Sequence, residues 1–117
     1  MSETIHDADL LLRRVQYLNP NFIKDDGSSA SSSFSLKSGE HGLSVDVERL
    51  TTHSHAIQDR SRFRLYALIA RQARSLGLEP VHDPIKANYA HCLIQGNISR
   101  SVARNLAKSA IRIGYPE

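Results

Sequence analysis

The stretch "NYAHCLIQGNISRSVARNLAKSA", residues 88–110, contains the signals of a β-strand, a turn and an α-helix in succession. Apolar and polar residues alternate over 89–95, which predicts a half-buried strand with every second side chain in the core. Gly96 ends this strand, and Ser99 is a suitable N-cap for the segment that follows. Apolar residues then recur at helical spacing over 100–113, so we expect a helix with one buried face there.

Two further strands are predicted in the first half of the chain. Residues 10–18, "LLLRRVQYL", are apolar and β-competent, and the Asn-Pro-Asn that follows ends the segment, although a short helix beginning near Asp7 or Asp9 is an alternative. Residues 43–47, "LSVDV", alternate between apolar and polar side chains, a pattern typical of a strand with one buried face.

Turn-forming residues predict irregular connections on either side of a long helix. Residues 24–42 are rich in Ser, Gly and Asp, so we expect a mostly mobile loop with at most one short strand at Phe34 and Leu36. Residues 59–77 carry apolar side chains at helical spacing up to Gly77, which predicts the second main helix. Residues 82–88 are predicted to form a turn-rich connection.

The predicted order of strand, strand, helix, strand, helix favours an α+β fold: a small mixed or antiparallel sheet with two main helices packed on one face. A length of 117 residues and a content of 40% hydrophobic residues suit a single domain over residues 1–117. No internal repeat is recognisable.

Composition restricts the setting and the partners. The single cysteine cannot form an internal disulfide, and the acidic N-terminus lacks the features of a signal peptide, so we expect a cytoplasmic protein with no membrane span. Residues 1–59 hold five Lys/Arg against nine Asp/Glu, whereas residues 60–117 hold ten against three. This asymmetry indicates an anionic partner for the second half, or contact between the two halves.

A candidate catalytic cluster consists of His91, Arg14 and Ser32. His91 interrupts an apolar strand and could move a proton near neutral pH, although a structural histidine is the alternative. Arg14, or its neighbour Arg13, and a hydroxyl from Ser32 or an adjacent serine could join it as charge clamp and oxyanion donor. Such a set would suit cleavage or transfer at a phosphodiester.

A candidate phosphate-binding edge lies on the last predicted helix. Its members are spaced four residues apart behind the N-cap, and they are Ser99, Arg100, Arg104 and Lys108, with Arg112 extending the row. Cations on one helix edge and the unpaired N–H groups of a helix start both attract phosphate. The alternative is an ordinary solvated face, and the turn lacks the pattern of a P-loop.

No metal site and no cofactor are predicted. His53 and His55 form an H-x-H pair that could bind a metal together with His82 and Asp83, but a surface pair is the simpler interpretation. Cys92 alternates away from His91 on the strand, so we expect it in the core.

Four segments, "SSSFS", "GLSVDV", "ARSLGLEPVHDPIKANYAHCLIQG" and "SRSVARNLAKSA", resemble a family of small uncharacterised bacterial proteins. The likeness spans about Leu12 to Ala110 and selects 31–34, His91 and Gly96, but Tyr89 stands where the family pattern has a proline. The resemblance implies a bacterial cytoplasmic origin and no particular reaction.

Two functions are therefore expected as alternatives. The first is binding of, or action on, a phosphate-bearing ligand such as RNA or a nucleotide, as in a ribonuclease-like defence or toxin component. The second is a non-catalytic interaction module or accessory subunit, whose serine-rich loop orders on a protein partner. Aromatic residues make up only 6% of the chain, so few side chains could stack on the bases of single-stranded nucleic acid. The sequence does not determine an oligomeric state.

Overall fold

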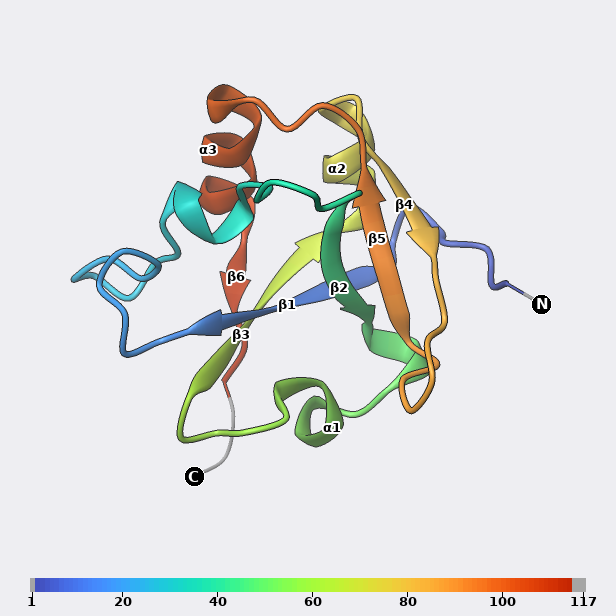
Figure 1. Ribbon diagram of the computed structural model, residues 1–117, viewed down its shortest axis with the longest axis horizontal. Coiled ribbons are helices and arrows are strands. Elements are labelled where there is room, and N and C mark those ends of the chain that lie inside the picture. The colour runs from blue at the N-terminus through green and yellow to red at the C-terminus, as the bar shows by residue number, and fades with distance from the viewer. Residues whose placement is uncertain (1, 115–117) are drawn as a thin grey trace.

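The computed structural model describes residues 2–114, which form an antiparallel sheet with the strand order β4-β5-β2-β1-β3-β6 (Figure 1). The strands are β1 (Leu10–Gln16), β2 (Leu43–Val47), β3 (Phe63–Ile69), β4 (Glu79–His82), β5 (His91–Gln95) and β6 (Ile111–Arg112). The helices are α1 (His53–Ile57), α2 (Ala70–Ser75) and α3 (Arg100–Ser109), with 3-10 turns η1 (Ser31–Phe34) and η2 (Glu48–Leu50). The predicted α+β class is confirmed.

Helices cover both faces of the sheet, and the two longer ones share a face. Alternation along β1 sends Leu11 into a core packed by α2, α3 and η1, and sends Leu12 into a smaller cluster packed by α1. In Figure 1, α2 and α3 accordingly lie together above the sheet and α1 lies below it. Any side chain on β1, β2 or β5 therefore belongs either to the α3 face or to the α1 face.

The helix predicted over residues 59–77 is mostly wrong. Phe63–Ile69 form β3, which pairs with β1 over seven residue pairs, and only Ala70–Ser75 are helical. The strand lies inside the sheet between β1 and β6, and each of its faces contributes to one of the two cores. Because both faces are buried, the apolar residues run together instead of alternating, and their spacing coincides with that of a helix.

The strands predicted over residues 10–18, 43–47 and 89–95 are confirmed as β1, β2 and β5. β4 was not predicted, because it is short and contains a proline, which an edge strand tolerates. Ser99 caps α3 as predicted, since its side chain accepts a hydrogen bond from the Val102 N–H. The helix is shorter than predicted and ends at Ser109, after which the chain pairs with β3 as β6.

The serine-rich segment 24–42 contributes directly to the core. Phe34 is fully buried and packs under α3, and Ser33 beside it is buried with its hydroxyl donating to the Phe22 carbonyl at 2.7 Å. The short strand predicted at Phe34 and Leu36 is wrong, because Ser31–Phe34 form a 3-10 turn. This turn places several serines beside the end of β1.

The turn between β5 and α3 requires glycine. Gly96 has φ +132°, and a Cβ atom there would come within 2.8 Å of the Leu78 Cδ2 and 3.3 Å of the Gly77 carbonyl oxygen. Both the backbone conformation and the space therefore disfavour a larger residue. Within residues 2–114, no helix is long and apolar enough to cross a membrane.

Candidate functional site

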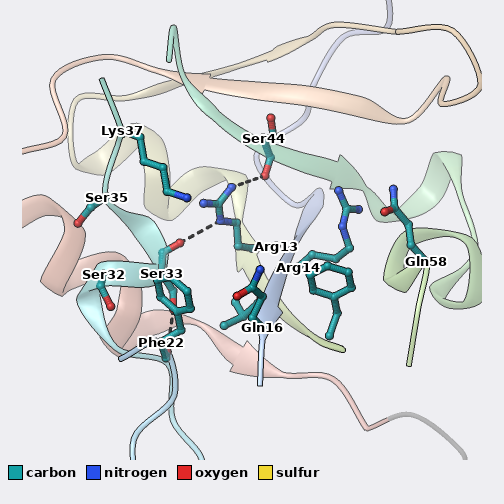
Figure 2. A pocket seen from close by; sticks show the side chains of 12 residues that line it. Arg13, Arg14, Gln16, Phe22, Ser32, Ser33, Ser35, Lys37, Ser44 and Gln58 are labelled. Carbon is teal, nitrogen blue, oxygen red and sulfur yellow. Dashed lines mark hydrogen bonds between the residues drawn. The ribbon is translucent and has the colours of Figure 1, made fainter. Parts of the chain in front are cut away.

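The two central strands separate at the point where the candidate site lies. β1 and β2 pair only at Leu11 with Val47 and at Leu12 with Asp46, although both strands continue past these pairs. Arg13 occupies the opening, where it donates to the backbone oxygens of Ser33 and Ser44, each at 2.9 Å (Figure 2). A side chain thus replaces the missing backbone ladder and leaves room around it.

The first hollow at this opening, which we call the serine hollow, has a volume of about 290 Å³. Its lining comes from β1, β2, the start of β3, the serine-rich segment and Gln58 just after α1, and Figure 2 shows Arg13 and Lys37 reaching toward one another inside it. The polar lining residues are Arg13, Arg14, Gln16, Ser32, Ser33, Ser35, Lys37, Ser44 and Gln58.

The second hollow, which we call the histidine hollow, adjoins the first and has a volume of about 800 Å³. The two hollows share Arg14, Ser44 and Gln58 as lining residues, so they lie side by side, and we call the pair, which extends from η1 to the β4–β5 connection, the groove. The remaining residues that line the histidine hollow are Thr52, Ser54, His55, Ile85, Lys86, Ala87, Asn88 and His91.

His91 is held by hydrogen bonds at both ring nitrogens. Its Nδ1 lies 2.9 Å from the backbone oxygen and 3.2 Å from the carboxylate Oδ2 of Asp83, and its Nε2 lies 3.1 Å from the Ser44 hydroxyl. A carbonyl oxygen can only accept, so Nδ1 carries the proton toward Asp83. In the neutral ring Nε2 then accepts the proton of the Ser44 hydroxyl, which is the arrangement of a base beside a nucleophile.

A buried carboxylate fixes the residues around the histidine. Asp46 is 2% exposed, and its two oxygens contact the Arg14 guanidinium at 3.5 Å and the Asn88 amide nitrogen at 2.9 Å. Arg14 also donates to the Ala56 carbonyl in α1 at 2.8 Å. The side-chain oxygen of Asn88 has no partner among the described residues. Asp46 thereby orients one cation and one amide toward the histidine hollow.

The lining of the groove is cationic. Arg13, Arg14, Lys37 and Lys86 line its two parts, and among residues 2–114 no Asp or Glu side chain does so. Burial lowers the pKa of the Arg13 guanidinium, but arginine stays charged at any physiological pH. The buried Asp46 carboxylate and the carboxylates of Asp83 and Glu40 balance part of this charge from outside the lining, which itself carries only cations.

The three predicted catalytic residues lie along this one groove. His91 and Arg14 line the histidine hollow, and Arg14 and Ser32 line the serine hollow. Ser32 itself donates its hydroxyl hydrogen to the Asn21 carbonyl. The hydroxyl that meets His91 is instead that of Ser44, so the structure brings the histidine and the arginine together around a different serine.

The predicted phosphate-binding residues lie on the α3 face of the sheet, whereas His91 and Arg14 lie on the α1 face. α3 packs against the core that contains Leu11, whereas Arg14 lies on the α1 face. Arg104 and Lys108 line a separate hollow together with Lys24 and the serines at 28, 29 and 31. Arg100 is exposed outside these hollows, and Arg112 belongs to β6 rather than to the helix. No single small ligand could touch both α3 and His91.

The candidate metal ligands and the cysteine do not form a site of their own among residues 2–114. His53 and His55 lie in α1, where the His53 Nε2 pairs with Glu48 at 3.0 Å and His55 lines the histidine hollow. Residues 2–114 contain no group of three His, Cys, Asp or Glu placed to hold a metal ion. Cys92 is fully buried as predicted, and burial raises the pKa of its thiol to about 12, which makes it a poor nucleophile.

Sequence reasoning did not select Ser44, Asp83 or Asn88 for this site. In the sequence, Ser44 is one polar residue of an alternating strand, and Asp83 is at most a candidate metal ligand. One signal was present: Ser44 and His91 both occupy the polar faces of predicted strands, so pairing of these strands would bring the two side chains together. Comparisons with protein-family models, with curated proteins and with solved structures found no match in any of the three.

Proposed function

We propose that this chain binds a phosphate-bearing ligand, RNA or a nucleotide, in the groove between β1, β2 and α1. The observation that carries the proposal is the pair of adjacent hollows lined by Arg13, Arg14, Lys37 and Lys86, with no carboxylate among the described lining residues. Cations along a groove attract phosphate groups, and an arginine guanidinium can form bidentate hydrogen bonds with them.

The serine hydroxyls of the groove suit the same class of ligand. Ser32, Ser35 and Ser44 line it beside the cations, and hydroxyl groups are common donors to phosphate oxygens. An accessory module whose serine loop orders only on a partner receives less support, because Phe34 and Ser33 of this segment are already buried in the core.

The test uses the two exposed lysines of the groove, because their removal leaves the buried contacts intact. Fluorescent single-stranded RNA of about ten nucleotides, and a fluorescent nucleotide, are titrated with the wild type and with Lys37→Gln/Lys86→Gln across a salt series. We expect weaker binding and a slope of log affinity against log salt that is shallower by about 0.7 for each lysine lost.

Arg104→Gln/Lys108→Gln is the matched comparison, because it removes the same charge from α3, in a separate hollow. A larger loss in the groove variant supports the proposal. A larger loss in the α3 variant would place the ligand on α3, equal losses would indicate attraction to net charge alone, and no binding by the wild type at low salt would refute phosphate binding altogether.

A further inference from the structure

The Ser44, His91 and Asp83 side chains form a chain of contacts on three different segments. Ser44 lies in β2 opposite Leu93, His91 lies in β5 opposite Asp46 and so diagonally across from Ser44, and Asp83 follows β4 immediately. The distances are 3.1 Å from the Ser44 Oγ to the His91 Nε2 and 3.2 Å from the His91 Nδ1 to the Asp83 carboxylate. We propose that Ser44 is a nucleophile that attacks the phosphorus of a phosphodiester bound in the groove, with His91 as its base and Asp83 as the group that orients His91.

The backbone makes this arrangement rigid. β2 and β5 are paired over four residue pairs around it, and the backbone N–H of Asp83 donates to the His91 carbonyl at 2.9 Å. His91 is 12% exposed at its side chain and Asp83 is 46% exposed, so the imidazole is shielded while the carboxylate faces solvent. A shielded base that is oriented by a carboxylate matches the requirements of an activated serine.

The reaction proceeds in two steps and needs no further reagent except water. The Ser44 oxygen forms a bond to phosphorus as its proton passes to the His91 Nε2, and the bond from phosphorus to one ester oxygen breaks as His91 returns the proton to that oxygen. Water then attacks the phosphoserine diester with His91 taking its proton, and the proton returns to the Ser44 oxygen as it leaves. The products are an alcohol and a phosphomonoester.

The neighbouring charges suit the transition state of this reaction. Arg14 and Lys86 line the same hollow as Ser44 and His91, so they can stabilise the non-bridging phosphate oxygens as negative charge develops on them. The inference rests on the proposed phosphate binding for its substrate class, but the reactivity of Ser44 can be measured separately with an uncharged reagent.

The test is labelling with a fluorophosphonate probe, which is uncharged at phosphorus and therefore does not depend on the cationic lining. Ser44 displaces fluoride from the probe, its oxygen becomes bonded to phosphorus, and its proton leaves with the fluoride as HF. We expect one label per chain, located by mass spectrometry at Ser44, that is absent in Ser44→Ala and at least tenfold slower in His91→Gln. Ser101→Ala, which removes an exposed hydroxyl on α3, is the control and should label like the wild type.

The labelling rate of Asp83→Asn separates an orienting role from a purely structural one. We expect several-fold slower labelling with an unchanged unfolding midpoint, whereas an equal rate would remove Asp83 from the proposal. Turnover of bis(4-nitrophenyl) phosphate by the wild type, lost in Ser44→Ala, then tests the substrate class.

Failure of this inference and failure of the proposed function give different results. RNA binding without any labelling of the folded wild type would overturn the nucleophile and leave the phosphate-binding groove in place. Labelling at Ser44 without RNA or nucleotide binding would support the nucleophile and overturn the proposed ligand. Labelling that persists in Ser44→Ala, or that is equal in His91→Gln, would refute the assignment of these residues.

Discussion

Replacement of Asp46 by asparagine should weaken the fold and strengthen ligand binding at the same time. Asp46 is buried on the α1 face, where one oxygen accepts from Asn88 and the other pairs with Arg14. Asparagine keeps the size of the side chain and keeps an oxygen for Asn88, but it removes the negative charge that partly neutralises Arg14. The charge that remains on Arg14 then faces the histidine hollow without its counter-ion.

The two effects can be estimated separately. Asp46→Asn loses the charge-assisted part of one hydrogen bond, and it loses one ion pair whose arginine is 27% exposed. It also removes the free-energy cost of burying a carboxylate, which offsets part of this loss. The free energy of unfolding should therefore fall by about 1–3 kcal/mol. One additional positive charge about 8 Å from a bound phosphate, in surroundings of intermediate dielectric constant, contributes about 1 kcal/mol, or roughly a fivefold gain in affinity at low salt.

Urea unfolding and RNA titration measure the two quantities on the same sample. Asp7→Asn is the control, because Asp7 is 62% exposed and pairs with Arg74 away from the groove. We expect the gain in affinity, together with a steeper salt slope, in Asp46→Asn only. Weaker or unchanged binding by folded Asp46→Asn would show that Arg14 does not face the ligand, and equal gains in both variants would indicate a net-charge effect.

Three further predictions concern the fold that supports the groove. Gly96→Ala should lower the free energy of unfolding by about 2–5 kcal/mol, because it combines a strained backbone with a steric clash. The control Gly39→Ala has the backbone strain of φ +86° but no atom within 4 Å of the new Cβ, so it should lower the free energy of unfolding by only about 1 kcal/mol. Equal urea midpoints of the two variants would refute the clash. Burial alone would raise the pKa of Asp9, but the 2.9 Å hydrogen bond from Arg49 and a backbone hydrogen bond outweigh burial and lower that pKa. The stability that Asp9 adds, measured against an Asp9→Asn variant, should therefore be present above about pH 4 and shrink as the pH falls below that value. The Cys92 thiol, with its pKa raised to about 12 by burial, should react with Ellman's reagent at pH 8 only after unfolding in urea, and fast reaction of the folded protein would contradict its burial.

The limits of sequence reasoning are clearest at β3. Phe63, Tyr66, Ala67 and Ala70 are spaced as on a helix, yet three of the four lie in a strand. A strand with both faces buried has no reason to alternate, so its local pattern does not distinguish it from a buried helix. The neighbouring strands determine that this segment is a strand, because β3 pairs with β1 on one side and with β6 on the other. Neither pairing can be recognised from a short window of sequence.

Part of the candidate site was predictable, because two of its residues are distinctive within their own strands. Arg14 and His91 stand out as charged or titratable side chains inside apolar strands, and such residues are conspicuous without any structure. Ser44 is not conspicuous, since a serine on the polar side of an alternating strand is ordinary. Its importance comes from the pairing of β2 with β5, which places it beside His91, and from the separation of β1 and β2, which opens the groove.

The strand order also has a consequence for how the chain folds. β4 and β5 form a hairpin of neighbours in sequence, but Leu10 pairs with Ile69 and Asp46 with His91 across tens of intervening residues. Because loops of this length must close before the central pairs form, we expect folding on a scale of milliseconds to seconds, with the β4–β5 hairpin able to form early. Ser44 and His91 meet only when β2 pairs with β5, so partly folded chains in which this long-range pairing has not formed should lack the serine–histidine contact.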